Sequence, residues 1–387
     1  MVTIGINGIG RIGKLLLWNA IATNSFDDIF INTGRQIGSS IYDIANYLLH
    51  DSSYGSLKSF IYGIEERKNK EDIFEYLNEE KGIIRTTNKT NLHFLRKHRN
   101  PKDIGWKNYN VDLVVDCTGR FLDPNLPASA EGGSARGHLE SGAIKLLLSA
   151  PFKIKKGEKT PNDAITTVMG INNEKYDPEK HNIISNASCT TTCLAHMMKP
   201  IIDKLSIDSI ISASMITVHA ATSSQNVLDS VPKAGAKDFR KNRSFSGNII
   251  LTTTGAAKAL ILVIPEMTNK PFLTESVRIP SVSGSIVILN LCLNGEESKK
   301  SINKIYKEAS EKDNNDYLAY TEIQNVSNDI VGSFNAAIIE ASETSVSASK
   351  LTSGEIISNA IIYGWYDNEM GYVRMLFENA ISIAKTL

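Results

Sequence analysis

The chain begins with short apolar runs that alternate with an amphipathic segment. The letters "VTIGIN" at 2–7 predict a β-strand, a glycine-rich turn follows, and apolar residues then recur at helical spacing at Ile12, Leu16 and Ala20. A second β-branched run, "DIFIN" at 28–32, predicts the next strand. A strand–helix–strand order over about thirty residues is what a dinucleotide-binding unit requires.

Two further apolar runs continue this half of the chain, "VDLVVDCTG" at 111–119 and "AIKLLLSAP" at 143–151. Continuous apolar runs of this kind are typical of parallel strands that are buried on both faces. The N-terminal half is therefore predicted to be a doubly wound α/β domain. Two polar segments, 65–100 and 123–136, carry charge, Asn, Gly and Ser without a packing pattern, and we interpret them as surface excursions.

After Cys189 the pattern changes to long, alternating, β-rich runs at 210–224, 272–295 and 333–349. Alternation of apolar and polar residues predicts strands with one buried face, and a largely antiparallel, mixed sheet fits it. The last segment, 351–387, ends in an amphipathic helix, which we expect to pack back on the first domain.

Composition narrows the class of protein. A chain of 387 residues predicts about two domains, and its 42 basic and 42 acidic residues give no net charge that would favour nucleic acid or a membrane surface. The four cysteines lack metal-ligand spacing, so no metal site is predicted. A reducing cytosol is the simplest interpretation of these few cysteines. With the absence of a signal-peptide pattern and of a long apolar segment, it leads us to expect a cytoplasmic protein.

The glycine turn contains Gly8, Gly10 and Gly13 in the pattern G-x-G-x-x-G. This pattern alone is weak evidence, but a predicted strand precedes it and a predicted helix follows, which is the context in which backbone N–H groups bind a pyrophosphate. The acidic residue expected after the second strand, where it would bind the adenosine ribose, is replaced by "NTGR" at 32–35. Arg35 either pairs with a 2′-phosphate or is a solvated loop residue beside a ribose held by backbone and Thr33.

Cys189 lies among hydroxyl residues in "ISNASCTTTCLA", at a predicted helix N-terminus where a thiolate would be stabilised. His219, on the apolar strand that follows, is the candidate base, although a lone strand histidine is more often a satisfied core residue. We interpret Cys117, Cys193 and Cys292 as structural.

A third group combines hydroxyl side chains, a glycine and an arginine, which are the parts of a phosphate site. Each hydroxyl taken singly is equally consistent with a helix cap or a turn. The residues of this group are Ser188, Thr190, Thr222, Thr254, Gly255 and Arg278.

Five separated motifs together resemble phosphorylating glyceraldehyde-3-phosphate dehydrogenases. They are "INGIGRIG" at 6–13, "SNASCTTTCLAHMMKPI" at 185–201, "VHAATSSQ" at 218–225, "TTTGAAKA" at 252–259 and "WYDNEMGY" at 365–372. The resemblance runs from Val2 to the C-terminus and rests on the order and rough spacing of the motifs.

The resemblance implies a particular architecture. It implies a Rossmann domain over 1–188, a catalytic and substrate domain over 189–355, and a C-terminal segment at 356–387 that returns to the Rossmann domain. It also implies a homotetramer.

The resemblance further implies the chemistry. Cys189 would form a hemithioacetal with glyceraldehyde 3-phosphate, with His219 as base, and hydride transfer to NAD or NADP would leave a thioester that inorganic phosphate converts into 1,3-bisphosphoglycerate. The process that this reaction serves would be glycolysis, gluconeogenesis or carbon fixation.

Individual binding roles follow from the same resemblance. Ser188, Thr190, Thr254 and Gly255 would bind the attacking phosphate, Thr222 and Arg278 would bind the substrate's C3 phosphate, and Arg240 and Arg243 would lie near these anions. The residues expected to bind the cofactor are Asn7, Gly8, Gly10, Arg11, Ile12, Gly13, Thr33, Arg35, Arg99, Thr118, Gly119, Ser149 and Asn368.

The chain departs from the family pattern at several positions. Thr192, Ala221 and Leu251 replace the usual Asn, a usually larger residue and the usual Pro, and insertions occupy 65–91 and 124–136. The missing acidic residue at 32–35 leaves the choice between NAD and NADP open. Two alternatives also remain: a related phosphorylated-aldehyde dehydrogenase, such as one that uses erythrose 4-phosphate, and a dehydrogenase-like redox or binding protein without catalysis.

Overall fold

The computed structural model describes residues 2–67, 72–223, 225–232, 234–314 and 316–387. These residues form two compact units. The first comprises the chain up to Ala187 together with Val373–Leu387, and the second comprises Ser188–Tyr372. The predicted fold class is confirmed, because a mostly parallel sheet forms the first unit and a mixed sheet the second.

The first unit is built on a nine-stranded sheet. Its strands from β10 to β7 pair in parallel, and β6 and β5 add an antiparallel edge. In spatial order they are β10 (Ala164–Thr166), β11 (Ile183–Ser185), β9 (Lys145–Leu148), β8 (Leu113–Asp116), β1 (Ile4–Asn7), β2 (Asp28–Asn32), β7 (Asn91–Leu95), β6 (Ile83–Thr86) and β5 (Phe74–Asn78).

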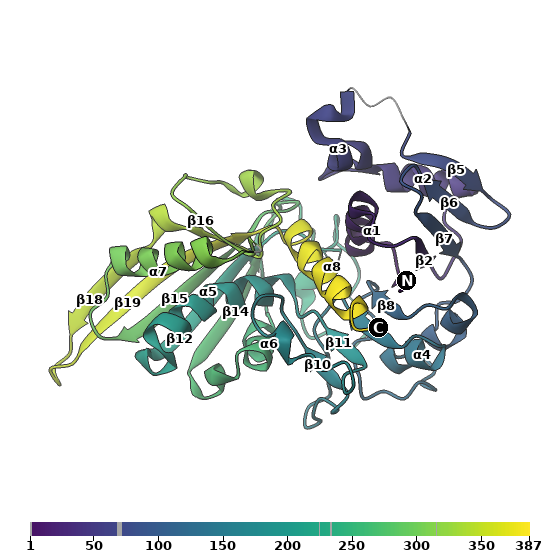
Figure 1. The fold of residues 1–387 in the computed structure, drawn as a ribbon. Coiled ribbons are helices and arrows are strands. Elements are labelled where there is room, and N and C mark those ends of the chain that lie inside the picture. Colours follow the sequence, from purple (N-terminus) through teal and green to yellow (C-terminus); the bar gives the residue numbers. More distant parts are fainter. Residues whose placement is uncertain (1, 68–71, 224, 233, 315) are drawn as a thin grey trace. The chain divides into compact units, whose positions relative to one another are not determined.

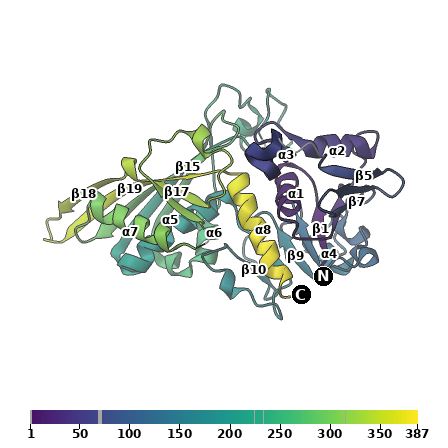
Figure 2. The ribbon, with the colours of Figure 1, turned by 45° about the horizontal axis from the view of Figure 1, so that its top comes forward.

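The helices of this unit connect the strands and cover the sheet. Contacts link α1 with α3, and α2 with β5 and β6 (Figure 2). The helices of this unit are α1 (Arg11–Thr23), α2 (Ile41–Leu49), α3 (Leu57–Tyr62), α4 (Ala135–Glu140) and the part of α8 (Met370–Ala384) from Val373 onward. A small hairpin is formed by β3 (His50–Asp51) and β4 (Gly55–Ser56).

Strand β1 lies between β2 and β8, so the strand order reverses direction at β1. In open α/β sheets ligands bind beyond the carboxyl ends of the strands at such a switch point. The side chains that end these three strands are Asn7, Asn32 and Asp116, and they lie in register across the sheet.

The interpretation of 65–100 as a surface excursion is wrong. Strands β5, β6 and β7 lie within this segment, and β7 pairs with β2 along its whole length. Ile84 and Leu92 are fully buried. These strands therefore have one buried face, although the segment is rich in polar residues. Residues 68–71 of the predicted insertion at 65–91 lie outside the described residues.

The second predicted excursion, 123–136, is a chain of turns until α4 begins at Ala135. Its end is anchored by Arg136, whose guanidinium donates to both carboxylate oxygens of Asp163 at 2.9 and 2.8 Å.

The second unit is built on an eight-stranded sheet that is mostly antiparallel. Only the pairs β12–β14 and β16–β17 run in parallel among the described strands. The strands are β13 (Ile250–Thr252), β14 (Phe272–Arg278), β12 (Ile210–His219), β15 (Ser285–Asn294), β19 (Ile356–Tyr366), β17 (Ala337–Glu340) and β16 (Leu318–Thr321), with β18 (Ser345–Lys350) paired to β19.

Helices α5 (Cys189–Leu205), α6 (Ala256–Val263) and α7 (Lys299–Lys312) lie on one face of this sheet (Figure 1). Alternate residues of β15, from Val287 to Leu293, are buried on the covered face. The opposite face keeps exposed apolar side chains such as Leu273, which is 75% exposed.

The predicted boundary at 356 does not match the structure. Strand β19 begins there and pairs with β15 over ten residues, so that 356–372 belong to the second unit. The part that joins the first unit is Val373–Leu387, where Asn379 of α8 donates to the side-chain oxygens of Thr167 and Asn186 at 2.9 and 2.8 Å.

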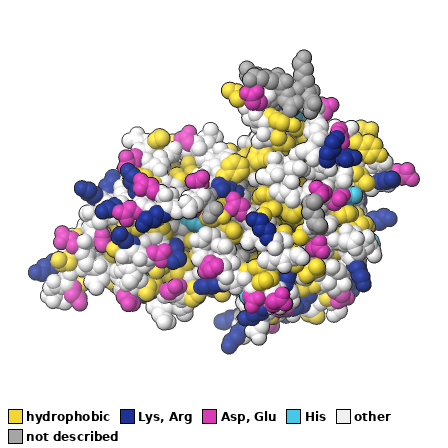
Figure 3. Space-filling view, in the orientation of Figure 1, with side chains coloured by type: hydrophobic (Ala, Val, Ile, Leu, Met, Phe, Trp, Pro, Cys, Tyr) yellow, Lys and Arg dark blue, Asp and Glu magenta, His cyan; other side chains and the backbone are white. Residues whose placement is uncertain are grey.

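The surface and the helices add two observations. Among the described helices, none combines the length and the apolar character that a bilayer span needs. On the face shown in Figure 3, Lys and Arg side chains are interspersed with Asp and Glu, as the balanced composition predicts.

Candidate active site

Cys189 is the first residue of α5. Ser188 is the N-cap, and its hydroxyl accepts a hydrogen bond from the Thr191 backbone N–H at 3.2 Å. The residue before this N-cap, Ala187, has φ of +53°, in the left-handed region. The local structure therefore places the thiol at a helix N-terminus, as the sequence predicts.

His219, the last residue of β12, lies opposite Cys189 with 3.4 Å between Nε2 and Sγ. Its Nδ1 lies 2.8 Å from the carbonyl oxygen of Ala220. Because a carbonyl only accepts, Nδ1 must carry the imidazole proton, which leaves the Nε2 lone pair directed at the thiol. This is the arrangement that a general base for a cysteine requires.

The ionisation states of this pair differ from the predicted thiolate. Burial raises the pKa of the Cys189 thiol above its usual value, although the positive charge of Arg278 acts in the opposite direction. Burial and the Arg278 charge lower the pKa of His219 to about 3. Both shifts favour a neutral thiol facing a neutral imidazole when no substrate is bound.

Arg278 ends β14 and is the register partner of His219 in the parallel pair β12–β14. Its Nη1 donates to the Ala220 carbonyl oxygen at 3.1 Å. Its Nε is buried and makes no hydrogen bond to any residue that the structure describes. A buried, unpaired guanidinium N–H is costly unless an anion completes it, which supports the predicted anion-binding role.

A hydroxyl network that sequence reasoning missed supports the two reactive side chains. The buried hydroxyl of Tyr366 lies 3.0 Å from Thr190 Oγ1 and 2.8 Å from Thr217 Oγ1. The Tyr366 ring meets the His219 ring edge-on, at 5.8 Å between centroids. Tyr366 belongs to the quoted "WYDNEMGY" motif, which was the available signal, whereas Thr217 had none.

Two other predicted phosphate residues make local contacts. Thr222 Oγ1 donates to Gln225 Oε1 at 2.7 Å, and Thr254 Oγ1 accepts from the Ala256 N–H at 3.2 Å. Gly255 is the N-cap of α6, and a side chain at that position would meet no atom within 4 Å. The first turn of α6 thus presents a backbone that an oxyanion can approach.

The two arginines predicted to lie near the anions are exposed and paired within their own loop. Arg240 donates to both carboxylate oxygens of Asp238, at 2.9 and 3.2 Å. Arg243 pairs with Asp229 at 3.0 Å. Their predicted role would require these exposed ion pairs, which contribute little to stability, to exchange for substrate.

The glycine turn of the first unit fits a dinucleotide. Gly8 has φ of +93°, and a Cβ on Gly13 would lie 2.0 Å from the Gly8 carbonyl oxygen, so this strand–helix junction excludes a side chain. At Gly10, the N-cap of α1, an added Cβ would meet nothing within 4 Å. The turn is therefore tight where helix and strand meet and open where a pyrophosphate would approach.

A pocket of about 280 Å³ adjoins this turn at the carboxyl ends of β1, β2 and β8. Three arginines line it, Arg35, Arg99 and Arg120, and Arg35 is exposed. Its other lining residues are Asn7, Gly8, Asn32, Thr33, Gly34, Thr118 and Phe121.

The ribose-side turn is shaped by its own hydrogen bonds. Thr33 Oγ1 donates to the Arg35 carbonyl oxygen at 2.6 Å, and Arg99 Nε donates to the Gly34 carbonyl oxygen at 3.3 Å. Asn32, the last residue of β2 and the first of the stretch 32–35 that lacks an acid, is buried.

Several other residues that are predicted to bind the cofactor also lie in the first unit. Arg11 forms an ion pair with the buried side chain of Asp51, and Ile12 is the next residue of α1. Thr118 and Gly119 follow β8, and the Ser149 backbone N–H donates to the Asp116 carbonyl oxygen at 3.0 Å.

Asn368 is a buried residue of the second unit. Its Oδ1 accepts a hydrogen bond from Ser285 Oγ at 2.9 Å, which fixes the orientation of its amide.

The structure also places two of the other cysteines and two of the residues that depart from the family pattern. Cys193 is buried one turn after Cys189, and Cys292 lies in β15. Thr192 is buried in α5, and Leu251 is an exposed residue of β13.

Comparisons with known proteins agree with this site. The family model for the glyceraldehyde 3-phosphate dehydrogenase NAD binding domain matches residues 2–124, and the model for the C-terminal domain of the same enzyme matches residues 188–368. Both Cys189 and His219 lie within the residues that the C-terminal domain model matches.

Full-length relatives extend the match to the whole chain. Glyceraldehyde-3-phosphate dehydrogenase 2 of Streptomyces avermitilis is 35% identical over 386 residues, covering 100% of this chain and 99% of the relative. Glyceraldehyde-3-phosphate dehydrogenase of Geobacillus stearothermophilus is 34% identical, covering 99% and 98%, and glyceraldehyde-3-phosphate dehydrogenase 1 of Bacillus subtilis has the same identity and coverage. The chain therefore belongs to the glyceraldehyde-3-phosphate dehydrogenase family.

Proposed function

We propose that the protein oxidises glyceraldehyde 3-phosphate and phosphorylates it to 1,3-bisphosphoglycerate, with reduction of NAD or NADP. The observation that carries this proposal is the Cys189 thiol facing the unprotonated Nε2 of His219 at 3.4 Å, in a member of this family. A hydrolase or a passive binding protein would have no need for this pair together with the dinucleotide turn.

The first step forms a carbon–sulfur bond. His219 Nε2 takes the thiol proton of Cys189 while Sγ attacks the aldehyde carbon, and the protonated His219 then gives that proton to the aldehyde oxygen, which becomes the hydroxyl of a hemithioacetal. The backbone N–H of Cys189 at the start of α5 supports the proposal, because a helix N-terminus stabilises the developing oxyanion.

The second step breaks the carbon–hydrogen bond of the hemithioacetal. A bound oxidised nicotinamide supplies the hydride acceptor. His219 again takes a proton, now from the hemithioacetal hydroxyl, and the product on Cys189 is a thioester.

The third step exchanges sulfur for phosphate. Inorganic phosphate attacks the thioester carbon, the carbon–sulfur bond breaks, and the thiol of Cys189 is regenerated when His219 returns the proton. The unpaired Nε of Arg278 and the open first turn of α6 at Gly255 support the binding of two anions, and Thr190 supplies a hydroxyl held by Tyr366.

For the cofactor, we propose that the pocket at the carboxyl ends of β1, β2 and β8 is the adenosine pocket and that it accepts NADP as well as NAD. An acidic residue at the end of β2 would repel a 2′-phosphate, whereas Asn32 is neutral. The exposed Arg35, with Arg99 and Arg120 on the same pocket, supports pairing with such a phosphate.

For the assembly, we propose a homotetramer that covers the bare face of the second unit's sheet. Leu251 pairs in register with Val277, Val277 with Val218, and Val218 with Ile286, which makes an apolar row across four strands. Leu251 is 58% exposed. Exposed apolar surfaces of this kind usually mark protein contacts.

For the compartment, we propose the cytosol. The four cysteines are free thiols, including the candidate nucleophile Cys189, and a reducing environment preserves them.

The reaction predicts a phosphate requirement. Purified protein should form reduced cofactor from glyceraldehyde 3-phosphate only when inorganic phosphate is present, and His219→Asn should lower kcat by about 10²–10⁴-fold because it removes the base. Cys189→Ser is the control for chemistry at the thiol. Phosphate-independent oxidation to the free acid would contradict the proposal, and faster turnover of erythrose 4-phosphate would favour the related-aldehyde alternative. A folded, cofactor-binding protein without turnover on either aldehyde would favour the binding-protein alternative.

The electrostatics predict how the thiol titrates. Because the Arg278 charge favours the thiolate, Arg278→Gln should raise the pKa of Cys189 further, and alkylation of the substrate-free protein by iodoacetamide at pH 7 should become roughly tenfold slower. The whole rate profile should move to higher pH. Lys312→Gln, at the far end of α7, is a matched charge control and should leave the profile in place. An unshifted profile in Arg278→Gln would show that this charge does not act on the thiol.

The pocket predicts a selective effect at Arg35. Arg35→Ala should weaken NADP binding by roughly tenfold or more, because a charge-assisted hydrogen bond is lost, and should change NAD binding little. Arg85→Ala, an exposed arginine of β6 paired with Glu75, is the control. Equal losses for NAD and NADP would rule out recognition of a 2′-phosphate.

The uncovered face of the second unit's sheet predicts which substitutions prevent the tetramer from forming. The wild-type protein should have the mass of a tetramer by light scattering, and the double variant Leu251→Asp, Leu273→Asp should dissociate, since each carboxylate would be buried in the interface. Ile64→Asp is the matched control, because Ile64 is 90% exposed in the first unit. A monomeric wild type, or a variant that stays tetrameric, would exclude this face as the contact.

A further inference from the structure

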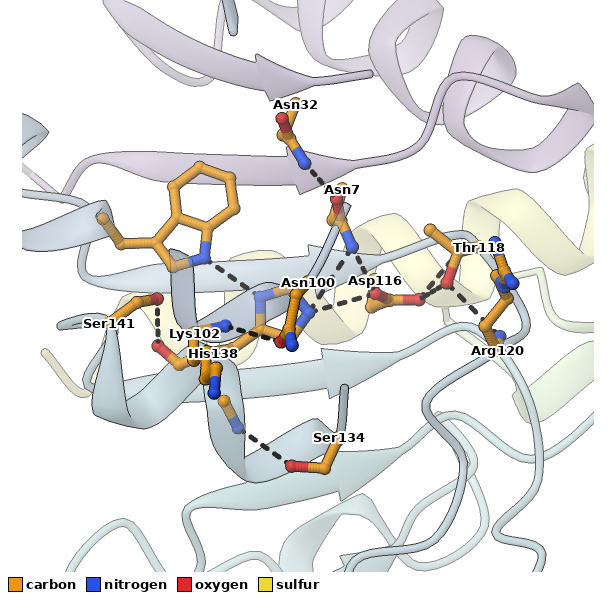
Figure 4. A network of polar contacts seen from close by, with 12 residues as sticks. Asn7, Asn32, Asn100, Lys102, Asp116, Thr118, Arg120, Ser134, His138 and Ser141 are labelled. Carbon is orange, nitrogen blue, oxygen red and sulfur yellow. Dashed lines mark hydrogen bonds and ion pairs between the residues drawn. The ribbon is translucent and has the colours of Figure 1, made fainter. Parts of the chain in front are cut away.

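A buried polar relay crosses the sheet of the first unit beneath the adenosine pocket (Figure 4). Its centre is Asp116, whose Oδ1 accepts from the Thr118 N–H at 2.9 Å and from Thr118 Oγ1 at 2.6 Å. The other oxygen, Oδ2, accepts from Asn7 Nδ2 at 2.7 Å and contacts His138 Nε2 at 3.1 Å. Four donors therefore surround one buried carboxylate.

The proton position on His138 is fixed from outside the relay. Trp106 Nε1, which can only donate, lies 3.0 Å from His138 Nδ1. Nδ1 must therefore accept, so Nε2 carries the proton and donates it to Asp116. His138 is completely buried on α4 and does not line the pocket.

The opposite end of the relay is fixed by backbone groups. Asn32 Nδ2 donates to the His98 carbonyl oxygen at 3.0 Å, and Asn32 Oδ1 accepts from the Gly34 N–H at 3.3 Å. The same Nδ2 donates to Asn7 Oδ1 at 2.8 Å, which turns the amide nitrogen of Asn7 toward Asp116. The hydrogen-bond directions imposed at the two ends are thus compatible at the links Asn32–Asn7, Asn7–Asp116 and His138–Asp116.

The relay joins the strand ends that carry the pocket. Asn7, Asn32 and Thr118 line the pocket themselves, and the Arg120 N–H donates to Thr118 Oγ1 at 3.3 Å. Burial alone would raise the pKa of Asp116, but hydrogen bonds from His138, Thr118 and Asn7 outweigh it and hold the pKa below its usual value. The carboxylate therefore remains an acceptor for all four donors at neutral pH.

We propose that His138 is a positioning residue for the dinucleotide: through Asp116 it holds the loop at Thr118 and the ends of β1 and β2 in the geometry that binds the cofactor. The proposal rests on the proposed binding of NAD or NADP by this unit. His138 acts without touching the ligand, because a carboxylate that loses one buried donor reorients toward those that remain, and Thr118 moves with it.

Two substitutions that differ in reach test the proposal. The Gln side chain of His138→Gln places an amide N–H where Nε2 lies and can still donate to Asp116, whereas that of His138→Asn is too short. We expect His138→Asn to weaken NAD and NADP binding by roughly tenfold, measured by isothermal titration calorimetry, and His138→Gln to stay within about twofold of wild type. The value of kcat at saturating cofactor should be unchanged in both.

A matched control separates positioning from stability. His181 is a second buried histidine of the same unit, and its Nδ1 accepts from the Asp177 N–H at 3.0 Å in a loop outside the pocket. His181→Asn should lower the melting temperature but leave cofactor binding unchanged. A His138→Asn protein that binds as wild type does, or a His138→Gln protein that binds as poorly as His138→Asn, would overturn the proposal.

A double-variant cycle gives a second readout. If the relay acts as a unit, Asn32→Ala combined with His138→Asn should weaken binding by less than the product of the two single effects, and fully multiplicative effects would contradict it. Absence of dinucleotide binding by the wild-type protein would instead refute the proposed function, so the two failures are distinguishable.

Discussion

The carbonyl oxygen of Ala220 is the acceptor on which the candidate chemistry depends. It accepts from His219 Nδ1 and from Arg278 Nη1, and so sets the tautomer of one side chain and the position of the other. The two donors reach the same oxygen because β12 and β14 run in parallel with His219 and Arg278 in register. A one-residue slip of either strand would direct one of these two side chains to the opposite face of the sheet. The strand register thus determines which face of the sheet can carry the base and the anion-binding arginine.

The first unit uses its sheet in a comparable way. Parallel pairing aligns the ends of β1, β2 and β8, and each of these buried strands ends in an amide or a carboxylate side chain. Three polar groups brought side by side in a buried setting must satisfy one another, because almost none of their surface is exposed to water. The hydrogen bonds that offset the free-energy cost of burying these polar groups also fix the loops around the pocket. Stability and ligand geometry therefore have a common origin there.

The sequence was sufficient for the strand–glycine–helix unit, because it has a local pattern with a mechanical reason. The pairing of Cys189 with His219 was predicted from the family resemblance, because a lone histidine on a strand has no such pattern. It was insufficient for β5, β6 and β7, since short, half-exposed strands at a sheet edge are interrupted by Asn, Lys and turn residues. The contact between Tyr366 and Thr217 joins residues 149 positions apart and depends on tertiary structure. The raised pKa of Cys189 was also hidden, because a helix N-terminus can be read from the sequence whereas burial cannot.

His219 and His138, both buried, show how one side chain acquires opposite functions. An acceptor-only carbonyl at Nδ1 makes the Nε2 of His219 a base that faces a thiol, whereas a donor-only indole at Nδ1 makes the Nε2 of His138 a donor that faces a carboxylate. Neither imidazole has to change charge to be held in place, and burial keeps both from exchanging partners with water. What distinguishes the proposed catalytic histidine from the proposed positioning histidine is therefore the group that contacts Nδ1.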